Sequence, residues 1–480
     1  MKKAYYVTTS IPYVNGDPHI GFGMEIIQAD VLARYARQQG NEVLFSTGTD
    51  EHGTKVAEKA IEENKDVVEF VQEKSDSFRE LCKALNISND RFIRTTDKGH
   101  EQRSQIIWQN LKKGDIYKGK YVGWYDVRQE EFVTESQADP ERMKPDHPQA
   151  YRKLEEENYF FKLSAYTEEV KQAIKSGKFE IIPQKRRNEI LAVLEKGLED
   201  ISVSRPKDKI SWGVPVPGDD TQVMYVWFEA LMNYITVLGY PEFDDFKRFW
   251  PANVQVIGKD IIRFHAAIWP AMLLSLGLSL PKKLYVHGFI NVDGQKMSKS
   301  IGNVIAPKEI LGKYGVDTYR YFFLRHTSSS DDGDFTWDKL AKAYNGELAN
   351  ELGNAVSRVA SMITRYQAGV IGDVPESKHD RREYDAAMEK CQFDIALSEV
   401  WEQVRGLNQF IDETKPWVIA KEQDPEHLQD VLAQAVSDLL QVAELLVPFM
   451  PDTASKIEHI FVKGVVRMPK ENLFPRLEIG

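Results

Sequence analysis

The chain has 480 residues, 42% of them hydrophobic, and a formal net charge of -11 at pH 7. At about 150 residues per domain this length predicts roughly three domains, and the composition excludes a disordered chain. No apolar run reaches the roughly 20 residues that span a bilayer, and residues 1–3 lead directly into a strand-like segment, so we expect a cytoplasmic protein without a membrane anchor. Any RNA binding must depend on local basic surfaces.

The N-terminal segment predicts the opening of a doubly wound α/β domain. Residues 4–9 are typical of a buried strand, and apolar residues then recur at helical spacing from about Ile20 until Gly40. A second strand is expected over 42–47, followed by the polar loop 48–53. In such folds ligands bind beyond the carboxyl ends of the strands. The loops after both strands are therefore candidate binding sites.

The pattern changes twice further along the chain. Helices are expected to about Lys113, and short strand-like pieces with a polar, Pro-containing stretch then indicate an inserted module. Strand patterns of the first type return at 201–205, 224–227 and 253–257, which suggests that the catalytic sheet is completed only after the insertion. Helical periodicity dominates from about Thr336, over 336–368, 382–413 and 427–447. We therefore expect an α/β fold with a doubly wound parallel-sheet (Rossmann-like) catalytic domain, an inserted α+β module and a following all-α helix bundle.

Two short motifs are candidates for binding phosphate. Residues 18–23, Pro-His-Ile-Gly-Phe-Gly, stand at the start of the first helix, where backbone N–H groups favour anions and His19 can donate a hydrogen bond. Residues 296–300, Lys-Met-Ser-Lys-Ser, follow the hairpin pattern 291–294 and predict a mobile loop whose lysines can clamp a triphosphate. Alone, a capping histidine and a solvated basic loop are the simpler interpretations.

Taken together, the two motifs resemble the signatures of class I aminoacyl-tRNA synthetases, His-x-Gly-His and Lys-Met-Ser-Lys-Ser. Residues 11–16, 48–53, 225–230 and 257–260 are similar to blocks of the methionyl-tRNA synthetases, and this similarity covers essentially the whole chain. The resemblance implies a methionine-tRNA ligase that activates L-methionine with Mg-ATP. The methionyl-adenylate would then react with the 3′-terminal adenosine of tRNA(Met).

The resemblance also implies the residues of each site. Methionine would be bound by Ile11, Tyr13, Asp50, Trp227, Ala230, Leu231, Tyr234, Ile261 and His265, with Asp50 facing its ammonium group. ATP would be bound by His19, Gly21, Gly23, Glu51, His52, Gly53, Lys296 and Lys299, and the catalytic residues would be His19, Lys296, Lys299 and Arg205. The anticodon would be read by Asn354, Arg358 and Trp417.

Structural roles remain open for several of these residues. Trp227 and Tyr234 are compatible with core packing, Asp50 with a helix cap, Arg205 with a structural ion pair, and Trp417 with packing after Pro416 at a helix start.

The resemblance divides the chain into five regions. They are a first catalytic half over 1–116, a connective module over 117–199, a second catalytic half over 200–270, a region over 271–345 with the lysine loop and tRNA-stem contacts, and an anticodon-binding domain over 346–480.

The sequence also departs from the family pattern. The two cysteines, Cys82 and Cys391, exclude a Cys-x-x-Cys site, so we expect no zinc. The chain stops after the helix bundle, which suggests a monomer, and Phe22 replaces the last histidine of the first signature. Because phenylalanine cannot donate a hydrogen bond, a silent tRNA-binding paralogue is one alternative. A class I synthetase for another apolar amino acid is the other.

Overall fold

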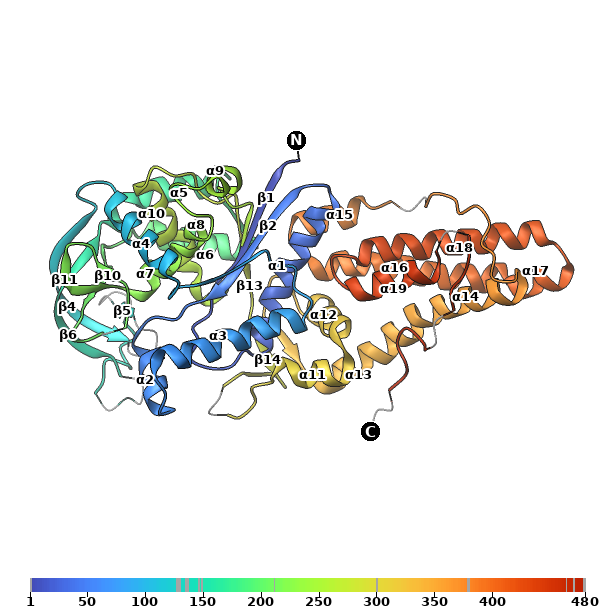
Figure 1. Cartoon of the computed structure of the whole chain (residues 1–480), viewed down its shortest axis with the longest axis horizontal. Helices are drawn as coiled ribbons and strands as arrows, with labels where there is room; N and C mark the ends of the chain where they lie inside the picture. The colour runs from blue at the N-terminus through green and yellow to red at the C-terminus, as the bar shows by residue number, and fades with distance from the viewer. Residues whose placement is uncertain are drawn as a thin grey trace. The chain divides into compact units, whose positions relative to one another are not determined.

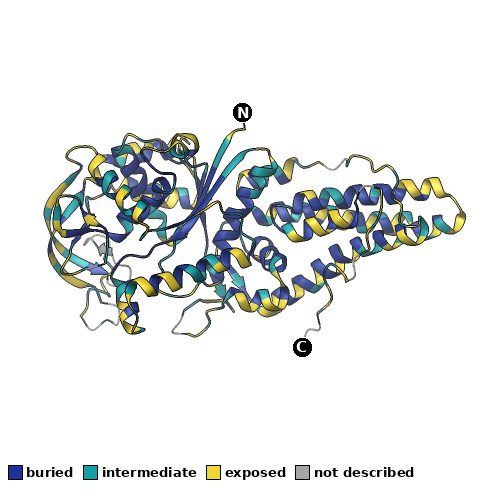
Figure 2. Cartoon of the chain, viewed as in Figure 1, coloured by how far each residue is buried: buried dark blue, intermediate teal, exposed yellow. Residues whose placement is uncertain are grey.

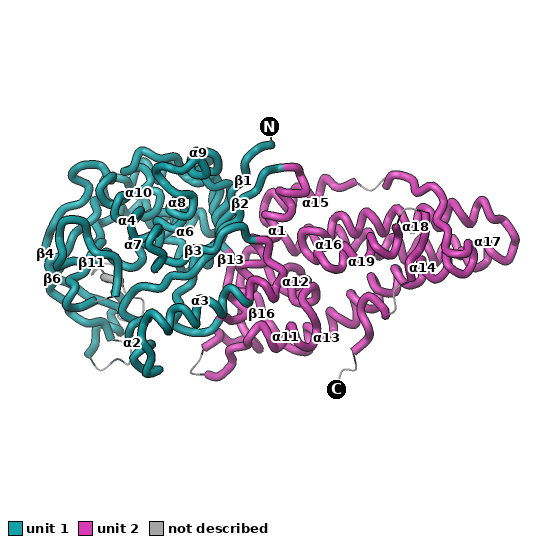
Figure 3. The backbone as a smooth tube through the Cα atoms, viewed as in Figure 1, with its two compact units in different colours: residues 1–17, 41–80, 89–286 teal, residues 18–40, 81–88, 287–480 magenta. Residues whose placement is uncertain are grey.

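The computed structural model describes residues 2–126, 131–133, 138–145, 147, 150–210, 212–298, 301–377, 380–462, 464–468 and 471–477 (Figure 1). Buried residues line the inner faces of the helices and strands, and exposed residues concentrate on the outer helix faces and the loops (Figure 2). The chain forms two compact units: unit 1 comprises residues 1–17, 41–80 and 89–286, and unit 2 comprises residues 18–40, 81–88 and 287–480 (Figure 3).

Unit 1 is built on a six-stranded sheet in the order β3-β2-β1-β12-β13-β7. Its strands are β1 (Ala4–Thr9), β2 (Glu42–Thr49), β3 (Arg91–Arg94), β7 (Glu180–Ile182), β12 (Val254–Gly258) and β13 (Lys283–His287). The central strand β1 pairs in parallel with both β2 and β12. This parallel order, which departs from the order of the strands along the chain, confirms the Rossmann-like class expected from the sequence.

Two smaller sheets and the remaining helices complete unit 1. The four-stranded sheet contains β4 (Ile116–Asp126), β5 (Glu131–Val133), β6 (Arg152–Phe161) and β8 (Ile201–Ser202), and the three-stranded sheet contains β9 (Ser204–Pro206), β10 (Pro215–Val216) and β11 (Asp219–Met224). The helices are α2 (Thr54–Glu62), α3 (Val67–Ala84, ending in unit 2), α4 (Lys98–Asn110), α5 (Thr167–Lys175), α6 (Gln184–Glu195), α7 (Val226–Leu231), α8 (Asn233–Thr236), α9 (Asp244–Phe249) and α10 (Trp269–Ser275).

Unit 2 is mainly helical. In this unit α1 (Ile20–Gln38) packs against α12 (Val316–Arg325), which also contacts α11 (Pro307–Tyr314). The unit also contains a small sheet of β14 (Ile290–Val292), β15 (Gln295–Lys296) and β16 (Gly333–Phe335). The helices α13 (Trp337–Ala343), η4 (Tyr344–Gly353) and α14 (Asn354–Tyr366) run on into a bundle with α15 (Arg382–Glu389), α16 (Phe393–Thr414), α17 (Pro416–Glu422), α18 (Pro425–Leu446) and α19 (Pro451–Ile460). In this bundle α18 packs against both α16 and α19 (Figure 1).

Two expectations about strands were wrong. The strand expected over 224–227 ends at Met224, and Val226 begins helix α7. Its aromatic and β-branched residues favour a strand locally, but tertiary packing overrides that preference. The strands at 201–205 exist, yet β8 and β9 pair in the two antiparallel sheets and not in the parallel one. The parallel sheet instead contains β7, which lies within the stretch expected to form the inserted module.

Candidate active site

His19 caps the first helix of unit 2. It is the N-cap residue of α1, its backbone is extended, and its Nδ1 accepts a hydrogen bond from the backbone N–H of Gly21 at 3.0 Å. A neutral imidazole that accepts at Nδ1 carries its proton on Nε2. The cap therefore leaves an exposed ring whose Nε2–H is a donor, so the capping role and a phosphate-binding role are compatible.

The two glycines of this signature do different work. A side chain at Gly21 would crowd the His19 ring, and Met297 of the lysine loop lies just beyond, with its Cε at 3.7 Å from that position. The two signatures therefore lie side by side within unit 2. A side chain at Gly23 would collide with the hydroxyl of the buried Tyr319 on α12. Gly23 thus permits close packing of two helices.

Phe22 lies in the interior of unit 2. Only 8% of its surface is exposed, whereas His19 at the same helix start is exposed. The aromatic ring is therefore part of the apolar packing around α1. This burial offers a structural reason for phenylalanine at a position where the signature usually has histidine.

The lysine loop begins at the hairpin that the sequence predicted. β14 and β15 pair antiparallel around Asp293 and Gly294, whose φ values of 51° and 74° fit a two-residue turn. Asn303 then holds the loop, because its Oδ1 accepts from the Ser298 backbone N–H at 2.8 Å and its Nδ2 donates to the Lys296 carbonyl at 3.3 Å. The Lys296 side chain is exposed. Lys299 lies outside the described residues.

In unit 1, the loop after β2 places Asp50 beside Tyr13. These residues form an isolated parallel bridge: the Asp50 N–H donates to the Pro12 carbonyl at 2.9 Å, and the Val14 N–H donates to the Asp50 carbonyl at 3.1 Å. Asp50 is only 5% exposed. The two loops that follow β1 and β2 are therefore joined through their backbones, as expected at the carboxyl edge of a parallel sheet.

Glu51 and His52 turn into the interior of unit 1. Both Glu51 carboxylate oxygens accept from Arg94, at 2.7 and 2.9 Å, and its backbone carbonyl accepts from the Trp212 indole N–H at 2.6 Å. His52 Nδ1 lies 2.9 Å from a carboxylate oxygen of Glu229. These contacts hold the loop in place. Gly53, with φ 99°, follows as the N-cap of α2.

The expected methionine residues gather around one hydrophobic core of unit 1. Leu231 and Tyr234 belong to that core, and Tyr13, Trp227 and Ile261 pack against it. Ile11 is half-buried and Ala230 is buried.

His265 is held at a defined protonation state in this core. Its Nε2 accepts from the Tyr234 hydroxyl at 2.6 Å, and its Nδ1 donates to the Ile261 carbonyl at 3.0 Å. Burial lowers the pKa of His265 to about 4, so the ring is neutral at physiological pH.

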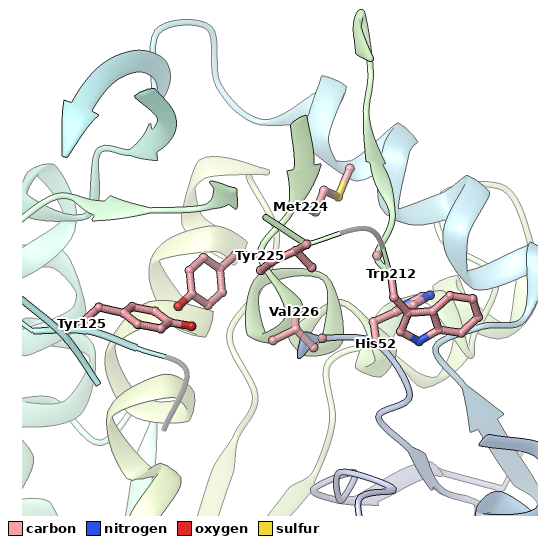
Figure 4. A pocket seen from close by; sticks show the side chains of 9 residues that line it. His52, Tyr125, Trp212, Met224, Tyr225 and Val226 are labelled. Atoms are coloured by element: carbon pink, nitrogen blue, oxygen red, sulfur yellow. The ribbon is translucent and has the colours of Figure 1, made fainter. Parts of the chain in front are cut away.

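A small pocket lies between the loop after β2 and the start of α7 in unit 1 (Figure 4). It is lined by His52, Gly53, Tyr125, Ile210, Trp212, Gly213, Met224, Tyr225 and Val226. His52 and Trp212 lie together at one side of the pocket, with ring centroids 5.4 Å apart, and Val226 at the start of α7 lies between them and Tyr225 (Figure 4). The pocket is therefore lined by both the loop after β2 and the N-terminal end of α7.

Arg205 is held in a buried ion pair. Its guanidinium donates two hydrogen bonds of 2.7 Å to Glu156 and lies 4.6 Å from the ring centroid of Tyr125. Burial acts against the charge of Arg205, but the Glu156 carboxylate and the neighbouring tyrosines raise the pKa of this side chain above its ordinary value. This geometry matches the structural alternative for Arg205, and its catalytic role stays a prediction.

The residues expected to read the anticodon come together at one end of the bundle in unit 2. Asn354 is exposed at the start of α14, and Arg358 lies one turn further along. The Arg358 guanidinium pairs with Asp412 at 2.6 Å and lies 5.9 Å from the ring centroid of Trp417. Trp417 is half-buried and follows Pro416, which begins α17 as expected. One face of the ring can thus be supported by protein while part of it stays accessible.

Sequence reasoning missed the partners that hold these loops. Glu229 bridges His52 and His100, and Arg94 fixes Glu51. Glu229 lies inside the matched block 225–230, which was the one available signal. No local pattern indicates that His100 or Arg94 would reach these groups.

Comparisons with known proteins identify the family. A model described as tRNA synthetases class I (M) matches residues 5–150 and 139–360. A methionine–tRNA ligase of Thermotoga maritima is 41% identical over 94% of this chain and 74% of its own length, and one of Brucella melitensis is 41% identical over 95% and 91%. The chain belongs to the class I methionyl-tRNA synthetases.

A solved structure supports this membership at the level of the fold. The Mycobacterium tuberculosis methionyl-tRNA synthetase in complex with methionyl-adenylate superposes with a TM-score of 0.90 and 36% identity, over 99% of this chain and 100% of that chain. The resemblance noted in the sequence is therefore confirmed, and so is the methionine-tRNA ligase activity that it implied.

The described residues form neither a cluster of metal ligands nor a membrane-spanning helix. Within the described ranges, no group of three or more His, Cys, Asp or Glu side chains is arranged to hold a metal ion. No helix in the part of the chain that the structure describes is both long and apolar enough to cross a membrane.

Proposed function

We propose that unit 1 binds methionine through the residues around Asp50 and α7. The amino acid's ammonium group would pair with Asp50, a buried carboxylate fixed through its backbone to Pro12 and Val14. Its thioether would lie against Trp227, Ala230, Leu231 and Ile261, because a polarizable sulfur gains from aromatic contacts. Ile11, Tyr13, Tyr234 and His265 complete this set.

The neutral state of His265 supports selection of an uncharged side chain. The His265 Nε2 is bound to Tyr234 and its Nδ1 to the Ile261 carbonyl, so the imidazole brings no charge into the proposed methionine site. A cationic or anionic amino-acid side chain would be buried there without a counter-charge, at high cost. A flexible apolar thioether meets no such penalty.

We propose that the ATP phosphates are bound on unit 2 by the first helix and the lysine loop. His19 would donate from Nε2, the N-terminal N–H groups of α1 would face negative charge, and Lys296 and Lys299 would neutralise the pyrophosphate. Gly21 is required for this arrangement because a side chain there would displace the His19 ring. Gly23 contributes by packing, and Glu51, His52 and Gly53 by shaping the loop that carries Asp50.

We propose the reaction that these two substrates undergo. ATP enters with Mg²⁺, the methionine carboxylate attacks the α-phosphorus in line, and pyrophosphate leaves. A ribose hydroxyl of the terminal adenosine of tRNA then attacks the carbonyl of the mixed anhydride and releases AMP. Because methionine supplies the nucleophile, the protein contributes positioning and charge stabilisation. Arg205 would act indirectly, through its ion pair with Glu156.

We propose further that Asn354, Arg358 and Trp417 read the anticodon. An unstacked base can lie on the accessible part of Trp417, and the Arg358 guanidinium beside the ring adds a donor and a positive charge.

We also propose a cytoplasmic monomer that needs no zinc. Elemental analysis of the purified protein should give far less than one zinc per chain, and activity should return when Mg²⁺ alone is restored after prolonged chelation.

The single observation that carries the methionine assignment is the fixed geometry of Asp50, bridged to Tyr13, and of the Tyr234–His265 pair, both in unit 1. ATP–pyrophosphate exchange, measured with each of the amino acids in turn, tests it. Exchange that depends on methionine supports the assignment. Exchange with leucine or valine instead would point to a different substrate, and no exchange at all would favour the silent tRNA-binding paralogue.

A further inference from the structure

A buried chain of three ionisable side chains joins three elements of unit 1. Glu229 on α7 lies 2.9 Å from Nδ1 of His52, through one carboxylate oxygen, and 2.7 Å from Nε2 of His100 on α4, through the other. Glu229 has no exposed surface, and each histidine is 2% exposed. His100 is itself held by Thr236, at 2.8 Å from its Nδ1.

The charges of His52 and Glu229 stabilise each other. Burial opposes ionisation, but the attraction of Glu229, with further contributions from Glu101 and Asp50, raises the pKa of His52 to about 10. The same contacts lower the pKa of Glu229 below its ordinary range, against the effect of burial. The His52–Glu229 contact is therefore an ion pair at neutral pH. A buried ion pair is costly to break because removal of one partner strands the other charge.

The cluster lies next to residues proposed to bind methionine. His52 follows Asp50 by two residues on the loop after β2, while Glu229 stands between Trp227 and Ala230 on α7. The α7 helix is only six residues long. Such a short helix is held by its contacts more than by its own hydrogen bonds. Glu229 thus connects the group that would hold the ammonium of methionine to the helix that would hold its side chain.

We propose that Glu229 is a positioning residue for methionine. By bridging His52 and His100 it fixes the spacing between Asp50 and the thioether-binding face of α7, and so sets the length of amino acid that fits. Glu229 contacts the protein and not the substrate. The inference rests on the methionine-binding role proposed above for Asp50, Trp227 and Ala230.

Glu229→Gln is the most direct test because it keeps the size of the side chain and removes its charge. Since misplacement of a binding group by about 1 Å can cost about 10²-fold, we expect the KM for methionine in ATP–pyrophosphate exchange to rise by between about tenfold and 10²-fold. The KM for ATP should change little. The preference for methionine over ethionine, which is one methylene longer, should shrink, because an intact apolar pocket discriminates one methylene by about 10- to 200-fold.

Asp115→Asn provides the matched control. Asp115 is another buried carboxylate of unit 1, 6% exposed, and it accepts hydrogen bonds from Tyr166 and Ser275, at 2.7 Å from the latter. Its substitution should lower the melting temperature without changing the KM for methionine or the preference over ethionine. A general loss of stability would affect both variants alike.

His100→Gln decides the matter if Glu229→Gln does not fold. It leaves the His52–Glu229 ion pair and should raise the KM for methionine in the same direction by a smaller factor. A folded Glu229→Gln or His100→Gln enzyme with unchanged methionine KM and unchanged ethionine preference would overturn the inference. Wild-type protein without methionine-dependent exchange would instead refute the proposed function, so the two failures are distinguishable.

Discussion

Replacement of Trp417 by alanine separates amino-acid activation from tRNA recognition. The half-buried ring lies 5.9 Å from the Arg358 guanidinium in unit 2, whereas the proposed methionine residues all belong to unit 1. One base stacked on an aromatic ring contributes about 1–3 kcal/mol. Because about 1.4 kcal/mol corresponds to a factor of ten, the KM for tRNA in charging should rise by between about fivefold and 150-fold. Pyrophosphate exchange should stay nearly unchanged.

Val418→Ala is a suitable control for this substitution. Val418 is the next residue on α17 and is 37% exposed, so its truncation tests whether damage to the helix alone lowers charging. Initial rates of charging at varied tRNA concentration, measured with exchange on the same preparations, give both quantities. If folded Trp417→Ala lost exchange and charging equally, or if Val418→Ala matched its charging defect, Trp417 would be a packing residue only.

The remaining predictions concern the first helix and the buried ion pair. His19→Ala should slow single-turnover adenylate formation on the order of 10²–10³-fold, as loss of one preorganised donor does. An unchanged His19→Ala rate would remove this residue from the mechanism. Phe22→His should lower the stability of the fold by about 1–3 kcal/mol because it buries a polar ring. Gly23→Ala should lower the melting temperature because the added methyl group would collide with the Tyr319 hydroxyl. Such overpacking lowers folding stability by about 1–3 kcal/mol. A Gly23→Ala/Tyr319→Phe double variant should recover part of this loss if the hydroxyl is the cause. The pKa of His52 is raised from 6.5 to about 10 in the folded chain. Its ion pair with Glu229 therefore stabilises the fold fully below about pH 6.5, and this contribution is lost as the pH rises through about 10. The difference in melting temperature between wild type and His52→Gln should narrow from about pH 7 to 10, and a constant difference would contradict the charge assigned to His52.

The sequence was most informative where local patterns determine the structure. The run of apolar residues in β1, the helical spacing after Ile20 and the Asp293-Gly294 turn all depend on near neighbours, and each appears as expected. The very short strands β3 and β7 carry too few residues to show a period. The helix at α7 was mistaken for a strand because its residues favour extended structure locally.

The candidate site was predictable in its composition but not in its internal contacts. Motif resemblance supplied Asp50, His19 and Trp417, whereas the partners of Glu229 lie 177 and 129 positions away in the sequence. Such pairings arise only from tertiary structure, since no periodicity relates residues so far apart. Arg205 is a similar case: its type suggested chemistry, and its pairing with Glu156 became visible only in the fold.

The central claim is that one chain both activates methionine and transfers it to tRNA. The most direct measurement is the formation of methionyl-tRNA from radiolabelled methionine, ATP, Mg²⁺ and tRNA(Met), with a tRNA(Met) carrying an altered anticodon as the matched substrate. We predict charging of tRNA(Met) that requires ATP and falls steeply with the altered anticodon. Binding of tRNA(Met) without any methionylation, under conditions where a known methionyl-tRNA synthetase is active, would contradict the account.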